Sequence, residues 1–253
     1  LGFHVVDNPF HPTYVRSTLL GHGAASRVYA VLDHDDKVID FYFKDEADRE
    51  AGVLSRLAQE GVPNVPQLVE ADTYMNMGLV LSPRATDLRL GQFARRHTLQ
   101  AIDTLQAAHE KAGLVHRDIR PANLLLQDNG DILVNDWGFA IPANKPRPYS
   151  GAFIHASDSV LGHIAEGKTT FAVGPADDLV SLVRTTLVLN FPHAAVVVEG
   201  AKKARCPPPE VARQLIAGWK SWLPRKWAKL QALAEKCDYD GVRRGLEELI
   251  PLP

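Results

Sequence analysis

The amino-acid sequence predicts an α+β protein, in which a small strand-rich N-terminal part precedes a larger and mainly helical part. Residues 14–43 hold three runs rich in apolar and β-branched side chains, separated by short polar turns, as in an antiparallel meander. At residue 46 the apolar pattern changes to the period of a helix. Beyond residue 90, most apolar patterns have that helical period.

The N-terminal part is expected to contain four strands and one helix. The strands cover residues 14–20, 28–32, 38–43 and 79–81. The helix covers residues 46–59, because its apolar residues fall on one face and Gly61, Pro63 and Pro66 follow it. Residues 82–84 then read as a linker.

The C-terminal part is expected to contain four helices and a hairpin. The helices cover residues 93–109, 178–190, 209–222 and 226–249. Residues 124–126 and 132–134 are apolar runs on either side of a polar turn, which predicts the hairpin.

Composition argues against several classes of protein. A net charge of −2 gives no sequence-wide field that would attract nucleic acid or an anionic membrane. No apolar stretch is long enough to cross a bilayer. Cys206 and Cys237 form no CxxC pair, so we expect neither a structural zinc site nor a disulfide framework. Because the sequence begins with Leu1, we expect it to be part of a longer chain.

The strongest motif begins with HRDIRPAN at residues 116–123 and ends, after the predicted hairpin, with DWG at residues 136–138. A carboxylate beside an attacking hydroxyl can orient it and accept its proton. An amide oxygen and a second carboxylate can hold a divalent cation against the phosphates of ATP. The chain offers Asp118, Asn123 and Asp136 for these roles.

This pattern resembles the catalytic loop and the metal-binding turn of the protein kinase superfamily. The resemblance implies a bilobal protein-kinase-like fold, with a small antiparallel-sheet N-lobe carrying one helix and a larger helical C-lobe. One domain would cover residues 1–253, with the N-lobe at about 13–81, the hinge at about 82–85 and the C-lobe at 86–253.

The resemblance also implies the cofactors and their partners in the chain. ATP would bind between the lobes together with Mg²⁺ or Mn²⁺, and Asn123 and Asp136 would hold the metal. Asp118 would orient the acceptor hydroxyl. Arg120, two residues further on, would neutralise charge on the transferring phosphoryl group.

Residues 21–28, with the sequence GHGAASRV, resemble the glycine-rich loop that covers the phosphates in the same family. Ser26 replaces the third glycine of that loop. Without the catalytic loop, a tight hairpin turn would be the better interpretation. The residues expected to contact ATP in this half of the chain are Gly21, Gly23, Ser26, Val28, Val80 and Ser82.

The expected helix 46–59 resembles the family's helix whose glutamate pairs with a strand lysine that binds phosphate. Glu50 would be that glutamate, unless it is a solvated carboxylate on the helix surface. Lys44, at the end of the third expected strand, would be its partner. A register shifted by two residues places Tyr42 there instead, and the chain would then lack the lysine.

Two further residues match the family around the catalytic loop. Asp178 would support the backbone of that loop from the start of a helix, although no Ala-Pro-Glu triplet precedes it. Arg117 would bind a phosphate on the preferred sites Thr169 and Thr170. The alternative is that Arg117 hydrogen-bonds backbone carbonyls or Asp158.

The resemblance favours phosphoryl transfer to protein hydroxyls, including autophosphorylation. Arg120 stands where Ser/Thr kinases carry lysine, which favours Ser/Thr over Tyr. One alternative is a pseudokinase that binds partners. Another is a small-molecule phosphotransferase, because Asp136-Trp137 resembles the aminoglycoside and choline kinases. We expect an intracellular protein, cytoplasmic or nuclear. A resemblance to the kinases of Crinkler effectors would instead place it in host cells.

Overall fold

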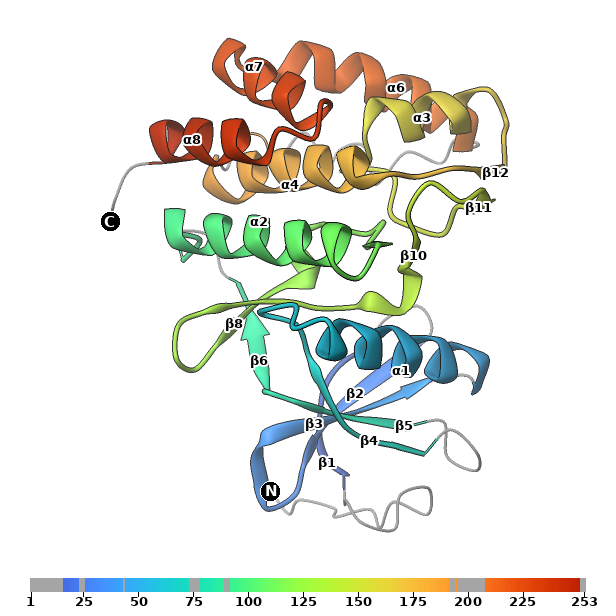
Figure 1. Cartoon of the computed structure of the whole chain (residues 1–253), viewed down its shortest axis with the longest axis vertical. Coiled ribbons are helices and arrows are strands. Elements are labelled where there is room, and N and C mark those ends of the chain that lie inside the picture. Colours follow the sequence, from blue (N-terminus) through green and yellow to red (C-terminus); the bar gives the residue numbers. More distant parts are fainter. Residues whose placement is uncertain are drawn as a thin grey trace.

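The computed structural model describes residues 16–22, 26–42, 44–72, 78–88, 92–191, 194 and 208–250. An antiparallel sheet near the N-terminus is followed by helices that stack above it (Figure 1). The predicted α+β class, with a small sheet part and a larger helical part, is confirmed. Within the described residues, no helix is both long and apolar enough to span a bilayer.

The N-terminal sheet has five strands in the order β1-β2-β3-β5-β4. They are β1 (Arg16–His22), β2 (Ser26–Val31), β3 (His34–Tyr42), β4 (Gln67–Asp72) and β5 (Gly78–Ser82). The predicted meander and the strand at residues 79–81 are confirmed, whereas β4 was not predicted. The expected helix is α1 (Lys44–Gln59), which lies between the sheet and the helical part (Figure 1).

Strand pairing assigns side chains to the two faces of this sheet. Val28 pairs with Asp40, which pairs with Leu79, so these three share a face. This inner face points toward α1, because Leu79 belongs to the same core cluster as Leu54 of that helix. Val80 lies on the outer face, in a separate cluster with Val31 and Ile39.

The helical part is built around α4 (Pro175–Asn190), whose residues 178–189 are all buried. The other helices are α2 (Arg95–Glu110), α3 (Asp158–Ala165), α6 (Pro208–Trp222), α7 (Arg225–Ala234) and α8 (Tyr239–Leu249). α2 lies nearest the N-terminal part, followed by α4 and then by α3, α6 and α7 (Figure 1). The predicted helices at 93–109, 178–190 and 209–222 are confirmed.

The single helix predicted over residues 226–249 is wrong, because the chain breaks between α7 and α8. Cys237 has φ 55°, a left-handed conformation that ends the helical path. Asp238 then caps α8, because its Oδ1 accepts a hydrogen bond of 2.8 Å from the Gly241 amide. A Cβ on Gly241 would lie 2.2 Å from the Asp238 carboxylate, so the cap requires glycine there.

Short elements connect the larger ones and form the region of the site. They are β6 (Ala85–Asp87), β7 (Leu114–Val115), η1 (Pro121–Asn123), β8 (Leu124–Gln127), β9 (Ile132–Val134), η2 (Trp137–Phe139), β10 (Ile141–Pro142), β11 (Arg147–Pro148) and β12 (Thr170–Phe171). β8 and β9 are the predicted hairpin, and β6 extends it to a three-stranded sheet.

Candidate active site

The loop with the sequence HRDIRPAN leaves the short strand β7 and ends at the start of β8. The hairpin β8–β9 returns the chain, so that Asp136 follows directly after it. Asn135 contacts this loop, because its backbone N–H donates a hydrogen bond of 2.8 Å to the backbone carbonyl of Asn123. The structure therefore brings the turn that carries Asp136 back to the loop that carries Asp118 and Asn123, as the motif predicted.

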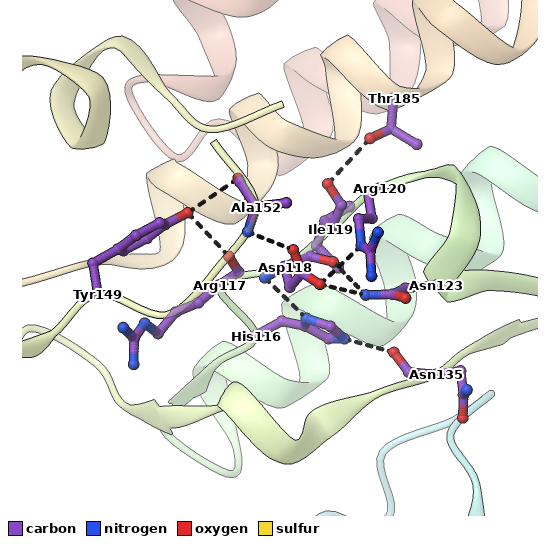
Figure 2. A network of polar contacts seen from close by, with 10 residues as sticks. All are labelled: His116, Arg117, Asp118, Ile119, Arg120, Asn123, Asn135, Tyr149, Ala152 and Thr185. Atoms are coloured by element: carbon purple, nitrogen blue, oxygen red, sulfur yellow. Dashed lines mark hydrogen bonds and ion pairs between the residues drawn. The ribbon is translucent and has the colours of Figure 1, made fainter. Parts of the chain in front are cut away.

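Asp118 is the centre of the polar network and is only 4% exposed. Its Oδ2 accepts hydrogen bonds of 2.9 Å from Arg120 Nε and from Asn123 Nδ2. Its Oδ1 accepts a hydrogen bond of 2.8 Å from the backbone amide of Ala152 (Figure 2). The contact with Ala152 joins residues 34 apart in sequence, and no residue-type pattern signals it.

Asn123 and Asp136 have the donor chemistry for a divalent cation. The Asn123 amide nitrogen donates to the Asp118 carbonyl at 2.8 Å, which leaves the amide oxygen as the group that could bind a cation. Among the described residues, no three His, Cys, Asp or Glu side chains gather as a metal site. A cation would thus rely on one or two carboxylates, the Asn123 oxygen and the phosphates of ATP, as Mg²⁺ commonly does.

The electrostatics of Asp136 fit a cation at this position. Burial raises the pKa of its carboxyl, and the nearby Asp118 carboxylate raises it further. His116 and Arg120 oppose part of this shift. Asp136 itself has φ 63°, a left-handed conformation at the start of the turn η2. A bound cation would offset the cost of holding this carboxylate ionised beside Asp118.

Asp178, at the start of α4, holds the backbone of the catalytic loop from behind. It accepts hydrogen bonds from the amides of His116 at 2.6 Å and Arg117 at 2.8 Å, so the predicted support is confirmed. A third donor, which the sequence did not predict, is His109 Nε2 at 3.0 Å. Burial raises the pKa of Asp178, but the hydrogen bond and charge of His109 and the loop amides lower it more, leaving it below the ordinary value.

His116 couples the catalytic loop to the turn that carries Asp136. Its Nδ1 accepts from the Asp118 amide at 3.2 Å, so Nε2 carries the proton and donates to the Asn135 carbonyl at 2.9 Å. The imidazole ring also packs on buried Trp137, with centroids 4.5 Å apart. Loop and turn are therefore fixed relative to each other by one side chain.

Glu50 on α1 faces the same turn, which explains the glycine after Asp136 and Trp137. Glu50 is only 1% exposed, so it is not a solvated surface carboxylate. A Cβ on Gly138 would lie 3.1 Å from Glu50 Oε2 and 3.8 Å from Asp136 Oδ1. Any larger side chain at this position would press on the Glu50 carboxylate.

The proposed partner of Glu50 is not where the sequence suggested. β3 ends at Tyr42, and Lys44 begins α1 instead of ending the strand. The placement of Lys44 on the strand is therefore wrong, because the helix starts two residues earlier than expected. The side chains of Lys44 and Tyr42 lie outside the described part of the structure, so the pairing with Glu50 stays a prediction.

The predicted adenine contacts need one correction. Val28 lies on the inner face of the sheet, but Val80 is fully buried on the outer face and cannot share a ligand with it. Pleating alternates the faces, so its neighbours Leu79 and Leu81 point inward instead. Ser82 ends β5, at the point where the linker was expected.

The glycine-rich loop is only partly described. Gly21 lies on β1 opposite Val28, and Ser26 begins β2, which agrees with a hairpin. Gly23 falls outside the described residues. Contacts of this loop with phosphate therefore remain a prediction.

Arg117 adopts the alternative in which it binds backbone carbonyls. Its guanidinium donates to the carbonyls of Phe139 and Pro148 and lies 5.3 Å from the ring centre of Tyr149. Asp158 does not contact it but pairs with Arg184, a fully buried residue of α4, at 2.6 Å. This pair anchors the start of α3, where the Ala-Pro-Glu triplet is missing.

Comparisons with known proteins agree with this geometry. A model of the RIO domain matches residues 33–151. CBL-interacting protein kinase 19 of Oryza sativa subsp. japonica is 31% identical over 160 residues, which cover 53% of this chain and 30% of the rice protein. CBL-interacting serine/threonine-protein kinase 19 of Arabidopsis thaliana is 28% identical over 157 residues, which cover 53% of this chain and 32% of that protein.

The chain thus spans about a third of the length of these curated relatives. The suggested likeness to Crinkler effector kinases gains no support from the matches. The two-part fold, the hydrogen bond between Asn123 and Asp118, and the family matches point to the same class of protein. In sequence and in fold, the chain is similar to members of the protein kinase superfamily.

Proposed function

We propose that the chain transfers the γ-phosphoryl group of ATP to a protein hydroxyl in the presence of Mg²⁺ or Mn²⁺. One observation carries this proposal: Asp118 is linked directly to Arg120 and Asn123, on a loop whose backbone is held by Asp178. This arrangement holds the Asp118 carboxylate, the Arg120 guanidinium and the Asn123 side-chain amide close together.

Each residue has a defined role in this proposal. Asp118 Oδ1 orients the acceptor hydroxyl and takes its proton as the oxygen bonds to phosphorus and ADP leaves. Arg120 neutralises charge on the transferring group, and its presence where Ser/Thr kinases carry lysine supports Ser/Thr acceptors. Asn123 and Asp136 would hold the divalent cation, which when bound neutralises charge on the phosphates.

An acceptor hydroxyl would meet Asp118 Oδ1 beside the backbone amide of Ala152, which donates to that oxygen at 2.8 Å. A carboxylate oxygen can accept two hydrogen bonds, so the amide leaves one position on Oδ1 for the hydroxyl. The segment around Ala152 packs closely on the catalytic loop, because a Cβ on Gly151 would lie 2.1 Å from the Arg117 carbonyl oxygen. This segment therefore borders the position that the acceptor would take.

A second candidate function is that of a binding module without phosphoryl transfer. It is favoured by Asp40, a carboxylate only 7% exposed on the inner face of the sheet beside Val28. A buried carboxylate there opposes the binding of an anionic nucleotide. α1 begins at Lys44, so β3 carries no lysine at its end that could bind phosphate, which also favours a binding module.

The two candidates differ in what ATP does. We expect ATP to raise the melting temperature more with Mg²⁺ than with EDTA, since a ligand of the native state stabilises it. We also expect labelled phosphate to pass from ATP to a mixture of basic proteins and to the chain itself. Stabilisation without any transfer would favour the binding module, and transfer only to small alcohols would favour a small-molecule phosphotransferase.

A further inference from the structure

A chain of three buried side chains links α8 to the catalytic loop. Tyr239, the first residue of α8, places its hydroxyl 2.6 Å from His109 Nδ1 on α2. His109 Nε2 lies 3.0 Å from Asp178 Oδ2 on α4. Their exposed fractions are 9%, 7% and 1% for Tyr239, His109 and Asp178, so water does not compete for these contacts.

The direction of each hydrogen bond follows from the chemistry of the groups. Burial raises the pKa of the Tyr239 phenol, and the nearby Cys237, Glu110 and Asp178 add to the shift. The phenol therefore keeps its proton and can donate it to His109 Nδ1. His109 Nε2 carries a proton and donates to Asp178, because an ionised carboxylate only accepts hydrogen bonds.

The carboxylate of Asp178 connects these hydrogen bonds to the catalytic loop. It accepts from His109 and, on its remaining lone pairs, from the amides of His116 and Arg117. Arg117 has φ 74°, a left-handed conformation that is costly for a residue with a side chain and must be held by its surroundings. Asp118 is the next residue, so its position depends on that backbone.

Tyr239 reaches His109 only because of the break between α7 and α8. The left-handed Cys237 and the cap at Asp238 start α8 in a new direction, against α2. Tyr239 lies outside residues 33–151, the part matched by the RIO domain model.

We propose that Tyr239 is a positioning residue for phosphoryl transfer, acting through His109 and Asp178 on the backbone that carries Asp118. The proposal rests on the phosphoryl-transfer function proposed above. Tyr239 touches no reacting group. Its hydroxyl fixes the His109 ring, the ring fixes the carboxylate, and the carboxylate fixes the loop.

The test replaces Tyr239 with Phe, which keeps the ring and removes only the hydroxyl. We expect kcat to fall about three- to tenfold, the size of one lost buried hydrogen bond, while KM for ATP stays unchanged. Val242→Ala is the matched control, because Val242 is fully buried on the same helix and its apolar side chain takes no part in the hydrogen bonds between Tyr239, His109 and Asp178. It should lower the melting temperature but leave kcat at the wild-type value.

Hydrogen exchange at the amides of His116 and Arg117 provides a readout that needs no activity. These amides should exchange faster in Tyr239→Phe and, once the change in global stability is subtracted, at the wild-type rate in Val242→Ala. An unchanged kcat or unchanged exchange in Tyr239→Phe would overturn the proposal, as would an equal loss of kcat in the control. If the wild type transfers no phosphate, the proposed function fails, and the exchange rates alone decide whether Tyr239 positions the loop.

Discussion

Two carboxylates flank the catalytic loop, and their surroundings are opposite. Asp178 behind the loop accepts three N–H groups, which hold its pKa below the ordinary value despite complete burial. Asp136 in front of the loop is partly buried beside the Asp118 carboxylate, and its pKa is raised. The first charge is satisfied by the fold, whereas the second is held at a cost that a bound cation would offset.

The two shifts make opposite contributions to stability as pH changes. The folded pKa of Asp178 lies below the ordinary 3.8, so its contribution is present above that value and is lost as pH falls through the folded pKa. The folded pKa of Asp136 lies above 3.8, so its ionised form weakens the fold as pH rises through that folded pKa. Substitutions at the two sites should therefore change stability in opposite directions.

The largest effect is expected from Asp178→Ala, which leaves two backbone amides and His109 without their acceptor. The free energy of unfolding should fall by about 3–5 kcal/mol at neutral pH, as measured by urea denaturation. Asp103→Ala is the control, because Asp103 is half exposed and pairs with Arg243 at the surface, a type of contact worth about 0–1 kcal/mol. An equal loss of unfolding free energy in the two variants would contradict the claim that Asp178 holds the catalytic loop.

A smaller effect of opposite sign is expected from Asp136→Asn. Removing the unfavourable charge should raise the melting temperature at neutral pH, while Mg²⁺-dependent binding of ATP is lost with the carboxylate. In the wild type, that binding should start to weaken on acidification at a pH above the range of an ordinary aspartate. A variant that melts below the wild type, or still needs Mg²⁺ to bind ATP, would contradict the account of Asp136.

The smallest effect is expected from Gly138→Ala, because its Cβ would lie 3.1 Å from Glu50 Oε2 and only a slight displacement relieves the contact. We expect phosphoryl transfer to fall about three- to tenfold, since small misplacements near the reacting groups slow transfer. Gly162→Ala on α3 is the matched control, because no atom lies within 4 Å of its new Cβ. The control should keep full activity and gain about 0.4–1 kcal/mol of stability. Undiminished transfer by Gly138→Ala would show that the Glu50 contact does not matter.

What the sequence could predict depended on how far apart the interacting residues are. Asp118, Asn123 and Asp136 lie within one short motif, so their meeting could be foreseen. The outward face of Val80 depends on its pairing with Ile39, which no local pattern reveals. The start of α1 at Lys44 could not be predicted either, because the apolar pattern of this helix begins only at residue 46.

Local patterns predicted none of the contacts that cross long stretches of sequence, and only the resemblance to kinases predicted the contact of Asp178 with the catalytic loop. His109 and Tyr239 are 130 residues apart, and Tyr239 depends on a left-handed cysteine that carries no sequence signal. The amide of Ala152 on Asp118 is a backbone contact, which any residue type except proline could supply.

The central claim is that Asp118 is the catalytic base of a phosphoryl transfer. Transfer of labelled phosphate from ATP should be compared between the wild type and Asp118→Ala, with circular dichroism and the melting temperature to establish that both are folded. We expect a loss of about 10²–10⁴-fold in the rate, the usual contribution of a general base, with ATP still bound. A folded Asp118→Ala variant that transfers phosphate at the wild-type rate would contradict the assignment.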